Sequence, residues 1–382
     1  MRVPMFDMAA HQTPFVEDLK AAVAAVIDTG HYVLGPAVSE LEERVARDLG
    51  VGHAVGVSSG TDALLVSLMA LGVGPGDLVL TTPYSFFATA GAIVRVGARP
   101  VFVDIDPETC TLSADAVKQY MATSAGRAVK AVMPVHLFGQ CAEMEPLLGA
   151  AKRFGVPVIE DAAQALGAKE ALSTGIAGAG TMGDVGCFSF YPSKNLGGIG
   201  DAGMVVTSNA ELAERIRTLR QHGATATYRH ALVGGNFRMD AIQAAALLVK
   251  LKYLEGWNQD RRERAMTYDQ GLASLDLVRP LSRRVRRSFH IYNQYVIRVR
   301  GRRDALCAFL GERGVGTAIY YPVPFHLQPC FADLGYPKGA FPESERAAEQ
   351  TLALPVHPDV SPDQQAHVIG SLAAFFRDSP AA

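Results

Sequence analysis

Short apolar runs alternate with helix-like segments through the first half of the chain, and this alternation restricts the fold more than any other feature. The runs are rich in β-branched residues and span 53–57, 77–82, 99–105, 130–136 and 156–161. Strand–helix alternation of this kind predicts a mostly parallel sheet with helices on both faces. Because the runs are almost continuously apolar, we expect both faces of the sheet to be covered, as in an α/β fold.

A second, smaller unit is expected from about residue 260. Helical spacing dominates in the stretches 209–223 and 238–275, and strands and helices then alternate again. The expected elements are a strand near 290–299, a helix over 303–314, a strand over 317–321 and a terminal helix over 361–376. We therefore predict a large domain over residues 1–255 and a smaller α+β domain over residues 256–382.

The composition excludes several classes of protein. With 49% hydrophobic and 19% charged residues, the chain is neither disordered nor unusually charged. A net charge of -2 gives no general electrostatic reason to bind nucleic acid or an acidic membrane. Arginines gather at 283–290 and 298–304, where alternating apolar residues indicate a strand flanked by solvated arginines: Phe289, Ile291, Tyr295 and Ile297.

Cysteine spacing and the N-terminal stretch indicate a cytoplasmic protein. The five cysteines are scattered and never in CxxC spacing, which argues against a disulfide framework or a metal site and fits a reducing compartment. The first residues lack the pattern of a signal peptide. No apolar run is long enough to cross a bilayer.

Polar residues stand at the ends of the expected strands, where open parallel sheets bind their ligands. After the run 53–57, the residues Ser58, Ser59, Gly60 and Thr61 begin a helix. Free N–H groups at a helix start, a hydroxyl and a glycine together suit a phosphate. Ordinary capping of the helix by Ser or Thr accounts for the same residues equally well.

Asp161 ends an apolar strand, where a carboxylate is costly unless a cation accompanies it. One interpretation is a structural salt bridge. The other is an acid held beside a protonated heterocyclic nitrogen. Gln164 would lie about one helical turn further along and reach the same ligand.

Lys194 stands in the stretch "FSFYPSKNLGGIGDAGMV", with no charged neighbour before Asp201. Apolar surroundings lower the pKa of a lysine and make its amine a nucleophile, as a Schiff base with an aldehyde requires. A purely structural role remains open for a single loop lysine. Ser189 precedes it and could add a hydroxyl to the phosphate site.

Taken together, these residues form a phosphate cradle, an acid for a pyridinium nitrogen and a lysine for an aldehyde. Pyridoxal 5'-phosphate carries those three groups. No G-x-G-x-x-G follows the first expected strand, which weakens a dinucleotide-binding interpretation. The joint pattern is far more specific than any of its parts.

The chain also resembles a known family along nearly its whole length. The motifs "SSGTDAL", "PYSFFATAGAI", "VIEDAAQALGA", "FSFYPSKNLGGIGDAGMV" and "GGNFRMDAIQAA" are similar to those of the nucleotide-sugar aminotransferases of the DegT/StrS type. These belong to the aspartate-aminotransferase superfamily of fold-type-I pyridoxal-phosphate enzymes. The resemblance implies a large domain with a mostly parallel seven-stranded sheet and a smaller α+β C-terminal domain.

The resemblance also implies roles for residues around the cofactor. Lys194 would hold the cofactor and then move a proton during the reaction, and Asp161 would pair with the ring nitrogen. Gln164 would approach the ring hydroxyl. The remaining contacts would be a phosphate site of Gly60, Thr61 and Ser189, and an aromatic ring over the cofactor from Phe86, with Tyr84 and Phe87 as neighbouring alternatives.

Further residues would act across a homodimer with shared sites. Asn236 of "GGNFRMD" would reach the phosphate of the neighbouring subunit, although ordinary dimer contacts remain open for its neighbours. The expected substrate contacts are Tyr191, Tyr228, His230, Arg238, Tyr320, Tyr321 and His326. For His326, an exposed position in a proline-rich turn is the alternative.

The activity implied is transfer of an amino group from L-glutamate, which leaves 2-oxoglutarate, to a nucleotide-linked keto-sugar by a ping-pong mechanism. The ending "NLGGIGDAG" is more similar to members that aminate C3 of the hexose. Sugar dehydratases of this type carry histidine in place of the lysine, so Lys194 argues against them. A regulatory protein that has lost catalytic activity is the third interpretation, but the residues of the phosphate site, Asp161 and Lys194 are all present.

Overall fold

The computed structural model describes residues 1–275, 278–281 and 289–377. Its central sheet has two hydrogen-bonded sets of strands, β3-β2-β4 and β1-β9-β8-β5. Parallel bridges from Val132 to Val158 and from Val135 to Asp161 join β4 to β5, which gives the order β3-β2-β4-β5-β8-β9-β1. The strands are β1 His53–Val57, β2 Leu78–Thr81, β3 Arg99–Phe102, β4 Val129–Val132, β5 Ile159–Asp161, β8 Val185–Ser189 and β9 Gly203–Thr207. All of these run parallel except β9, which confirms the expected mostly parallel sheet.

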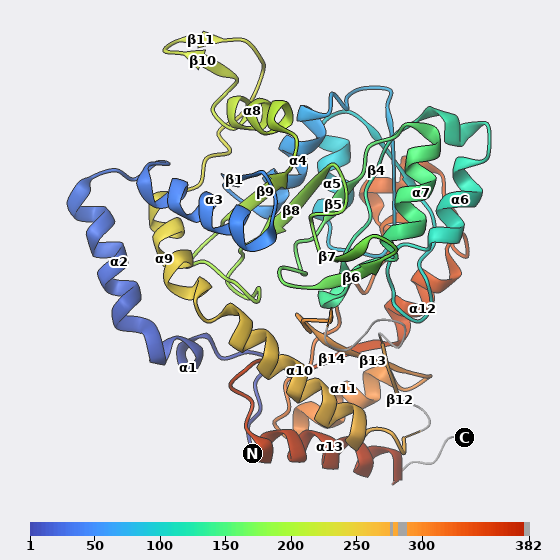
Figure 1. Ribbon diagram of the computed structural model, residues 1–382. Helices are drawn as coiled ribbons and strands as arrows, with labels where there is room; N and C mark the ends of the chain where they lie inside the picture. The colour runs from blue at the N-terminus through green and yellow to red at the C-terminus, as the bar shows by residue number, and fades with distance from the viewer. Residues whose placement is uncertain (276–277, 282–288, 378–382) are drawn as a thin grey trace.

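Helices cover both faces of the sheet because successive strand residues point to opposite sides (Figure 1). On one face α4, α5 and α8 pack over Val55, Val79 and Val205. On the other face α3 and α9 pack over Met204 and Val206, and α6 and α7 continue this layer. The bounds are α3 Pro36–Leu49, α4 Gly60–Ala70, α5 Ala88–Arg95, α6 Ala114–Met121, α7 Met144–Phe154, α8 Ala210–Leu219 and α9 Ala241–Leu251.

The C-terminal part is built on a smaller antiparallel sheet of order β12-β13-β14. Its strands are β12 Val278–Pro280, β13 Tyr295–Val299 and β14 Thr351–Leu354, and its helices are α10 Leu254–Gly271, α11 Arg303–Glu312, α12 Pro342–Gln350 and α13 Pro362–Arg377. One face of β13 packs with α10, α11 and α13. Val296 on the other face packs with Tyr84 and Phe138 of the large sheet's loops. This contact places the C-terminal part over the carboxyl ends of the parallel strands.

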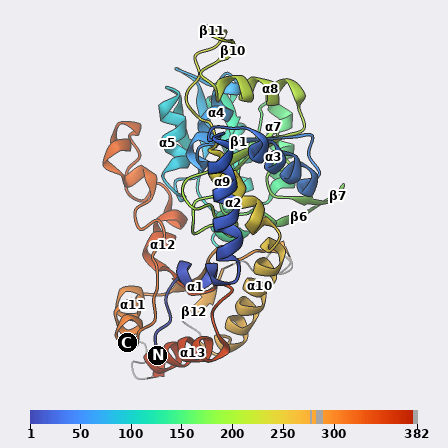
Figure 2. The same ribbon diagram turned by 90° about the vertical axis from the view of Figure 1, so that its left-hand side faces the viewer.

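The N-terminal segment links the two parts of the molecule. Val3 forms a parallel bridge with Val315, so the chain begins against the C-terminal part. Figure 2 shows the start of the chain beside α13, with α2 running up along α9. The helices here are α1 Met8–Gln12 and α2 Val16–Thr29. The segment before α1 consequently lies where the two parts meet.

Several expected elements differ from the structure. The strand expected over 317–321 is reduced to one bridge between Ala318 and Ala353. Tyr321 adopts a φ of 57°, and the prolines at 322 and 324 donate no hydrogen bond, so the segment cannot continue a ladder. Between the expected helical stretches 209–223 and 238–275 the structure has a hairpin of β10 Ala224–Ala226 and β11 Arg229–His230, which was not expected. A second hairpin, β6 Lys169–Leu172 and β7 Gly175–Gly178, was not expected either.

The predicted strand with solvated arginines on either side can be tested only in part, and the part that can be tested is partly wrong. Residues 282–288 lie outside the described part of the chain. The strand begins at Tyr295, so Phe289 and Ile291 precede it. Arg298 is not a solvated side chain, because a guanidinium N–H donates to the Cys110 thiol at 3.4 Å. Helices cover one face of β13 and loops of the large sheet cover the other, which explains why apolar residues occupy both of its faces.

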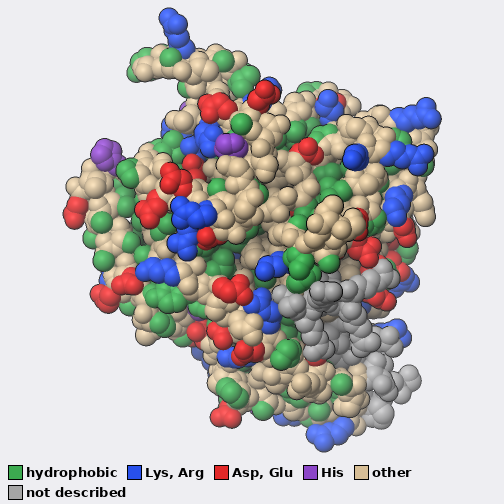
Figure 3. All heavy atoms as spheres, in the orientation of Figure 1, with side chains coloured by type: hydrophobic (Ala, Val, Ile, Leu, Met, Phe, Trp, Pro, Cys, Tyr) green, Lys and Arg blue, Asp and Glu red, His purple; other side chains and the backbone are tan. Residues whose placement is uncertain are grey.

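The surface of the molecule matches the low net charge. Figure 3 shows acidic and basic side chains interspersed over one face, without a continuous patch of one sign. Within the described residues, no helix combines the length and the apolar character that a membrane span needs. The boundary between residues 255 and 256 falls at the start of α10 and stays a prediction.

Candidate active site

A cavity of about 580 Å³ lies at the carboxyl ends of the strands, between the large sheet and the C-terminal part. This volume is typical of a site for a small molecule and its cofactor. The predicted residues that line it are Gly60, Thr61, Phe86, Asp161, Gln164, Ser189, Tyr191, Lys194, Tyr320 and Tyr321. Segments more than 250 residues apart in sequence therefore meet here.

The start of α4 and the end of β8 form one wall of the cavity. Ser59 caps α4 by accepting a hydrogen bond from the Asp62 N–H at 3.0 Å. The first N–H groups of a helix have no acceptor within it, so those of Gly60 and Thr61 are available to a ligand. A Cβ on Gly60 would lie 2.6 Å from the Ser189 Cβ, which excludes any side chain there. This wall therefore offers N–H groups and hydroxyls to an anion.

Asp161 supplies a buried carboxylate to the cavity and is 4% exposed. The Thr89 hydroxyl donates to its Oδ2 at 2.7 Å, and the Ala163 N–H donates to its Oδ1 at 3.3 Å. Burial raises the pKa of Asp161, and these hydrogen bonds and the charge of Lys194 oppose that rise. A cation beside the carboxylate would relieve the cost of burial, so the geometry suits a protonated ring nitrogen.

Lys194 brings its amine into the same cavity. Burial lowers the pKa of Lys194 to about 8, although the nearby charge of Asp161 acts in the opposite direction. A much larger share of the amine is therefore neutral near pH 7 than in a solvent-exposed lysine. A neutral amine in a cavity with a buried acid is suited to attack an aldehyde.

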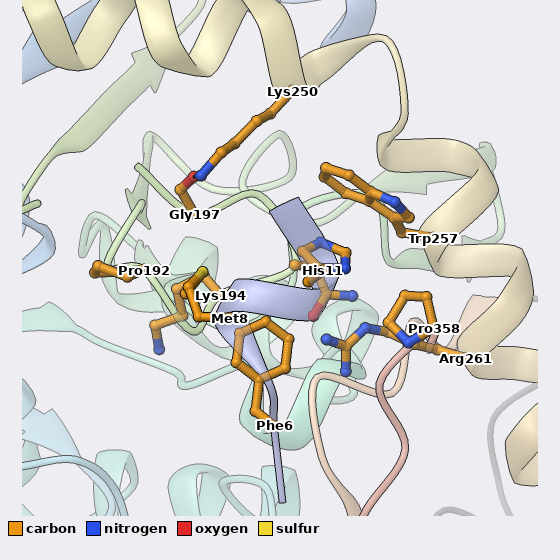
Figure 4. Close-up of a pocket in the computed structure, with 11 residues that line it drawn as sticks. Phe6, Met8, His11, Pro192, Lys194, Gly197, Lys250, Trp257, Arg261 and Pro358 are labelled. Atoms are coloured by element: carbon orange, nitrogen blue, oxygen red, sulfur yellow. Dashed lines mark hydrogen bonds between the residues drawn. The ribbon is translucent and has the colours of Figure 1, made fainter. Parts of the chain in front are cut away.

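The loop that carries Lys194 is held by polar side chains from both parts of the molecule. The Asn195 amide donates to the Asn258 Oδ1 at 2.6 Å and accepts from the Asn293 amide at 2.8 Å. The Lys250 amine donates to the carbonyls of Gly197 and Gly198 at 2.8 and 3.2 Å. Figure 4 shows the Lys250 side chain extending from its helix to Gly197. The amine of Lys194 is therefore presented by a fixed loop.

The glycines after Lys194 have a steric reason. A Cβ on Gly197 would lie 2.2 Å from the Pro192 carbonyl oxygen. Only glycine allows the chain to fold back this closely.

Comparison with known proteins decides the family. Residues 15–373 match the DegT/DnrJ/EryC1/StrS aminotransferase family. The chain belongs to this aminotransferase family.

Individual relatives agree with this assignment over almost the full length. The "Pleiotropic regulatory protein" of Geobacillus stearothermophilus is 43% identical over 99% of each chain. The UDP-N-acetyl-3-dehydro-alpha-D-glucosamine 3-aminotransferase of Acidithiobacillus ferrooxidans is 40% identical over 96% of each chain. The crystal structure of NtdA from Bacillus subtilis, solved with pyridoxamine phosphate, has a TM-score of 0.90 at 30% identity and covers 98% of this chain and 85% of that chain.

This aminotransferase uses pyridoxal 5'-phosphate, as its family and the cofactor-bound structure of NtdA show. The fold-type-I architecture is confirmed by the same likeness. The residues present fit the cofactor: an anion-binding wall at Gly60 and Ser189, a buried acid at Asp161 and an amine of low pKa at Lys194. The individual roles of these residues remain predictions.

Gln164 and Tyr321 are linked at the next part of the wall. The Gln164 Nε2 donates to the Tyr321 hydroxyl at 2.6 Å, and its Oε1 accepts from the Phe138 N–H at 2.7 Å. Burial raises the pKa of Tyr321, so this phenol stays protonated. Both polar ends of Gln164 are thus already bonded, which fixes its orientation beside the cofactor site.

The three candidates for the aromatic ring over the cofactor, Tyr84, Phe86 and Phe87, lie in different surroundings. Phe86 lines the cavity and is 61% exposed. Tyr84 is fully buried, with its hydroxyl 2.9 Å from the Thr351 Oγ1. Phe87 turns away and packs against Phe331. The structure therefore favours Phe86 as the ring that covers the cofactor.

Five predicted residues lie outside this cavity. Asn236 and Arg238 lie on a segment that bridges to Gln221 and Val57, respectively. Tyr228, 94% exposed, and His230 belong to the β10–β11 hairpin, which projects from the body of the molecule in Figures 1 and 2.

The fifth residue, His326, contradicts the sequence-based expectation. It is neither exposed nor in the cavity: the residue is 3% exposed, and its Nε2 lies 2.9 Å from the Glu345 Oε1. The ring also packs edge-on against Phe341. The turn that carries His326 is closed over these neighbours, which explains its burial.

Sequence reasoning missed several polar residues at the site, and three of them matter for the arguments below. Thr89 bonds Asp161, and Arg261 and His357 line the cavity from the C-terminal part.

It also missed the pair behind β5. The Glu160 carboxylate, buried at 0% exposure, accepts N–H groups from Gly180, Met182 and Gly183 and contacts the His136 Nε2 at 2.7 Å. Because Glu160 and Asp161 are adjacent in a strand, their side chains point to opposite faces. Glu160 therefore anchors the strand end that presents Asp161.

Proposed function

We propose that this aminotransferase moves an amino group from an amino acid, L-glutamate by expectation, to a nucleotide-linked keto-sugar. The observation that carries the proposal is one cavity lined by an anion-binding helix start, the buried acid Asp161 and the low-pKa amine of Lys194. The Acidithiobacillus ferrooxidans relative is named as a 3-aminotransferase of a UDP-linked sugar, and this name supports the substrate class.

The residues divide the chemistry between them. Bound cofactor supplies an aldehyde that takes up the amino group and a ring that accepts electrons as a Cα–H bond breaks. The amine of Lys194 would bind that aldehyde and, once released, accept and return the proton at the substrate carbon. Asp161 would hold the proton on the ring nitrogen, oriented by the Thr89 hydroxyl at 2.7 Å. Gly60, Thr61 and Ser189 would hold the phosphate.

Ping-pong kinetics follow from the use of one site by both substrates. The donor leaves its nitrogen on the enzyme as 2-oxoglutarate departs, and the keto-sugar then collects it. We propose that the sugar substrate carries its ketone at C3, and the name of the Acidithiobacillus relative supports this position. A dTDP-linked 3-keto-6-deoxyhexose and a UDP-linked 3-keto-N-acetylglucosamine-type uronate are the two sugars of this class that we favour.

We further propose a cytoplasmic homodimer in which each site is completed by the partner. Asn236, Tyr228, His230 and Arg238 lie outside the cavity of their own chain, and the hairpin that carries two of them projects from the body. In a dimer these residues would reach the phosphate and sugar of the second site. No nucleic acid or membrane partner is part of this proposal.

The test is direct. The pyridoxamine form of the purified enzyme is mixed with dTDP-, UDP- and GDP-linked keto-sugars, and NMR locates the new amine. Amination at C3 of a nucleotide-linked sugar is expected, with glutamate as the donor that restores the pyridoxamine form. Amination at C4, or of free keto acids alone, would refute the proposed substrate.

A regulatory role is the second candidate, because the Geobacillus stearothermophilus relative is named as a regulatory protein. The catalytic candidates Lys194 and Asp161 nevertheless both line the same cavity in this chain, which supports an enzyme. A Lys194→Ala variant separates the two readings. Loss of transamination is expected; a fully active variant would contradict the assignment of Lys194.

A further inference from the structure

The end of the cavity beneath the C-terminal part carries buried polar groups that the chemistry above does not use. Arg261, Asn293, Gln294 and His357 line this end. All four residues are less than one-tenth exposed. Buried polar atoms usually have partners, so unbonded ones that face a cavity point to a ligand.

Arg261 is the central group. It is 5% exposed, and one guanidinium nitrogen donates to the carbonyls of Tyr292 and Asn293 at 3.1 and 3.3 Å. Its Nε is buried without a partner, and among the described residues no carboxylate forms an ion pair with it. Burial lowers the pKa of Arg261 to about 10, with Asp359 acting in the opposite direction from a distance. A buried arginine without an acid is unusual unless an anion arrives from outside.

The surrounding charges favour such an anion. Asp359 is engaged by His11 at 2.9 Å and lies 3.5 Å from the His357 Nδ1, so its charge is shared by these two rings. The other ring nitrogen of His357, Nε2, is buried and has no hydrogen-bond partner among the described residues. In Figure 4 the guanidinium of Arg261 points from its helix toward the part of the pocket where Phe6 and Lys194 lie.

We propose that Arg261, with His357 beside it, binds a carboxylate of the amino-acid donor. This inference rests on the proposed aminotransferase function and adds the residue that selects the donor. A planar guanidinium binds a carboxylate through two parallel hydrogen bonds. Because the residues that line this end of the cavity are all less than one-tenth exposed, a small carboxylate suits it better than the diphosphate of a sugar nucleotide does.

A purely structural role is the competing explanation, and the chain offers a matched control. Arg264 lies on the same helix and also bonds two backbone carbonyls, those of Val360 and Pro358 at 2.9 and 3.1 Å. Arg264 does not line the cavity. Replacing either arginine removes bonds to carbonyls, but only Arg261 would remove a ligand contact.

The probe is glutarate, a dicarboxylate that has neither an amine nor a ketone and so cannot react. Trp257 is the only tryptophan in the sequence and stands one helical turn before Arg261. Its fluorescence therefore reports glutarate binding to the cofactor-loaded enzyme, with glutaramide as the uncharged control. The same enzymes are then followed through each half-reaction by the visible absorption of the bound cofactor.

The expected results separate the two roles. Arg261→Gln should weaken glutarate binding at least tenfold and raise the glutamate concentration needed for the donor half-reaction, while the keto-sugar half-reaction changes little. Arg261→Lys should restore part of the binding, and Arg264→Gln should leave it unchanged. Equal loss in Arg261→Gln and Arg264→Gln, or a loss confined to the sugar half-reaction, would overturn the proposal. Arginine-dependent glutarate binding in an enzyme that aminates no sugar would refute only the proposed substrate.

Discussion

The hydrogen bond from Thr89 to Asp161 gives the sharpest prediction for the acid that pairs with the cofactor. A Thr89→Val variant removes only the hydroxyl and keeps the branched shape of the side chain. Thr89 is fully buried and Asp161 is 4% exposed, so water cannot replace the lost donor at 2.7 Å. The remaining hydrogen bond to this carboxylate, from the Ala163 N–H, is longer at 3.3 Å. The ionised form of Asp161 should therefore be stabilised much less by hydrogen bonds.

The size of the effect follows from the type of bond. A buried hydrogen bond to a charged group contributes about 1.5–3 kcal/mol. At about 1.4 kcal/mol per tenfold change, we expect a roughly 10- to 100-fold loss in the rate of the donor half-reaction. The pKa of Asp161, already raised by burial, should rise further. The acidic limb of the pH–rate profile should consequently move to higher pH.

The assay is single-turnover conversion of the cofactor-loaded enzyme with glutamate, measured across pH. Thr89→Ser is the matched control, because it keeps the hydroxyl and should behave nearly as the wild type does. Among the described residues, the Thr89 hydroxyl has two side-chain partners: the Asp161 carboxylate and the Ser85 hydroxyl, whose Oγ lies 2.8 Å from the Thr89 Oγ1. An unchanged rate and an unchanged acidic limb in Thr89→Val would refute the reasoning.

Three further predictions follow from the same geometry. Uptake of cofactor by the apoenzyme should rise with pH around a midpoint near 8, the lowered pKa of Lys194, since only the neutral amine reacts; a midpoint near 10.5 in stopped-flow absorbance would contradict this. Gly60→Ala should weaken cofactor binding at least tenfold, because its Cβ would lie 2.6 Å from the Ser189 Cβ, whereas Gly149→Ala, with open space, should be neutral in an equilibrium titration. Glu160→Gln should lower the free energy of unfolding by about 3–5 kcal/mol in urea titrations, since a buried carboxylate with four partners is lost; a change below 1 kcal/mol would show that Glu160 is not an anchor.

The sequence predicted the parallel sheet and several residues that line the cavity for a common reason. Asp161, Ser189 and the start of α4 follow strands directly, so local patterns were sufficient to place them at one edge of the sheet. The same logic failed for 317–321, where apolar residues indicated a strand. There the positive φ of Tyr321 and the prolines that follow override the preference for a strand.

The sequence contains a pattern that indicates the burial of Arg261, but the high charge of the segment obscures it. Its segment, "NQDRRERAMTYDQ", is highly charged and resembles a solvated helix face. The buried residues Asn258, Arg261, Ala265 and Tyr268 nevertheless recur at spacings of three and four, which is the buried stripe of a helix. The role of the hairpin residues could not be predicted in the same way, because the proposed sharing of a site between subunits leaves no pattern within one chain.

The two buried lysines at the cofactor loop show why position alone does not make a lysine reactive. Burial lowers the pKa of both Lys194 and Lys250 to about 8. The amine of Lys250, however, donates to two backbone carbonyls, and these acceptors favour its charged form. Lys194 has no such acceptor among the described residues, so its lone pair is available while Lys250 holds the loop beneath it. Borohydride treatment of the cofactor-loaded enzyme should therefore label Lys194 alone, and a label on Lys250 would reverse the two roles.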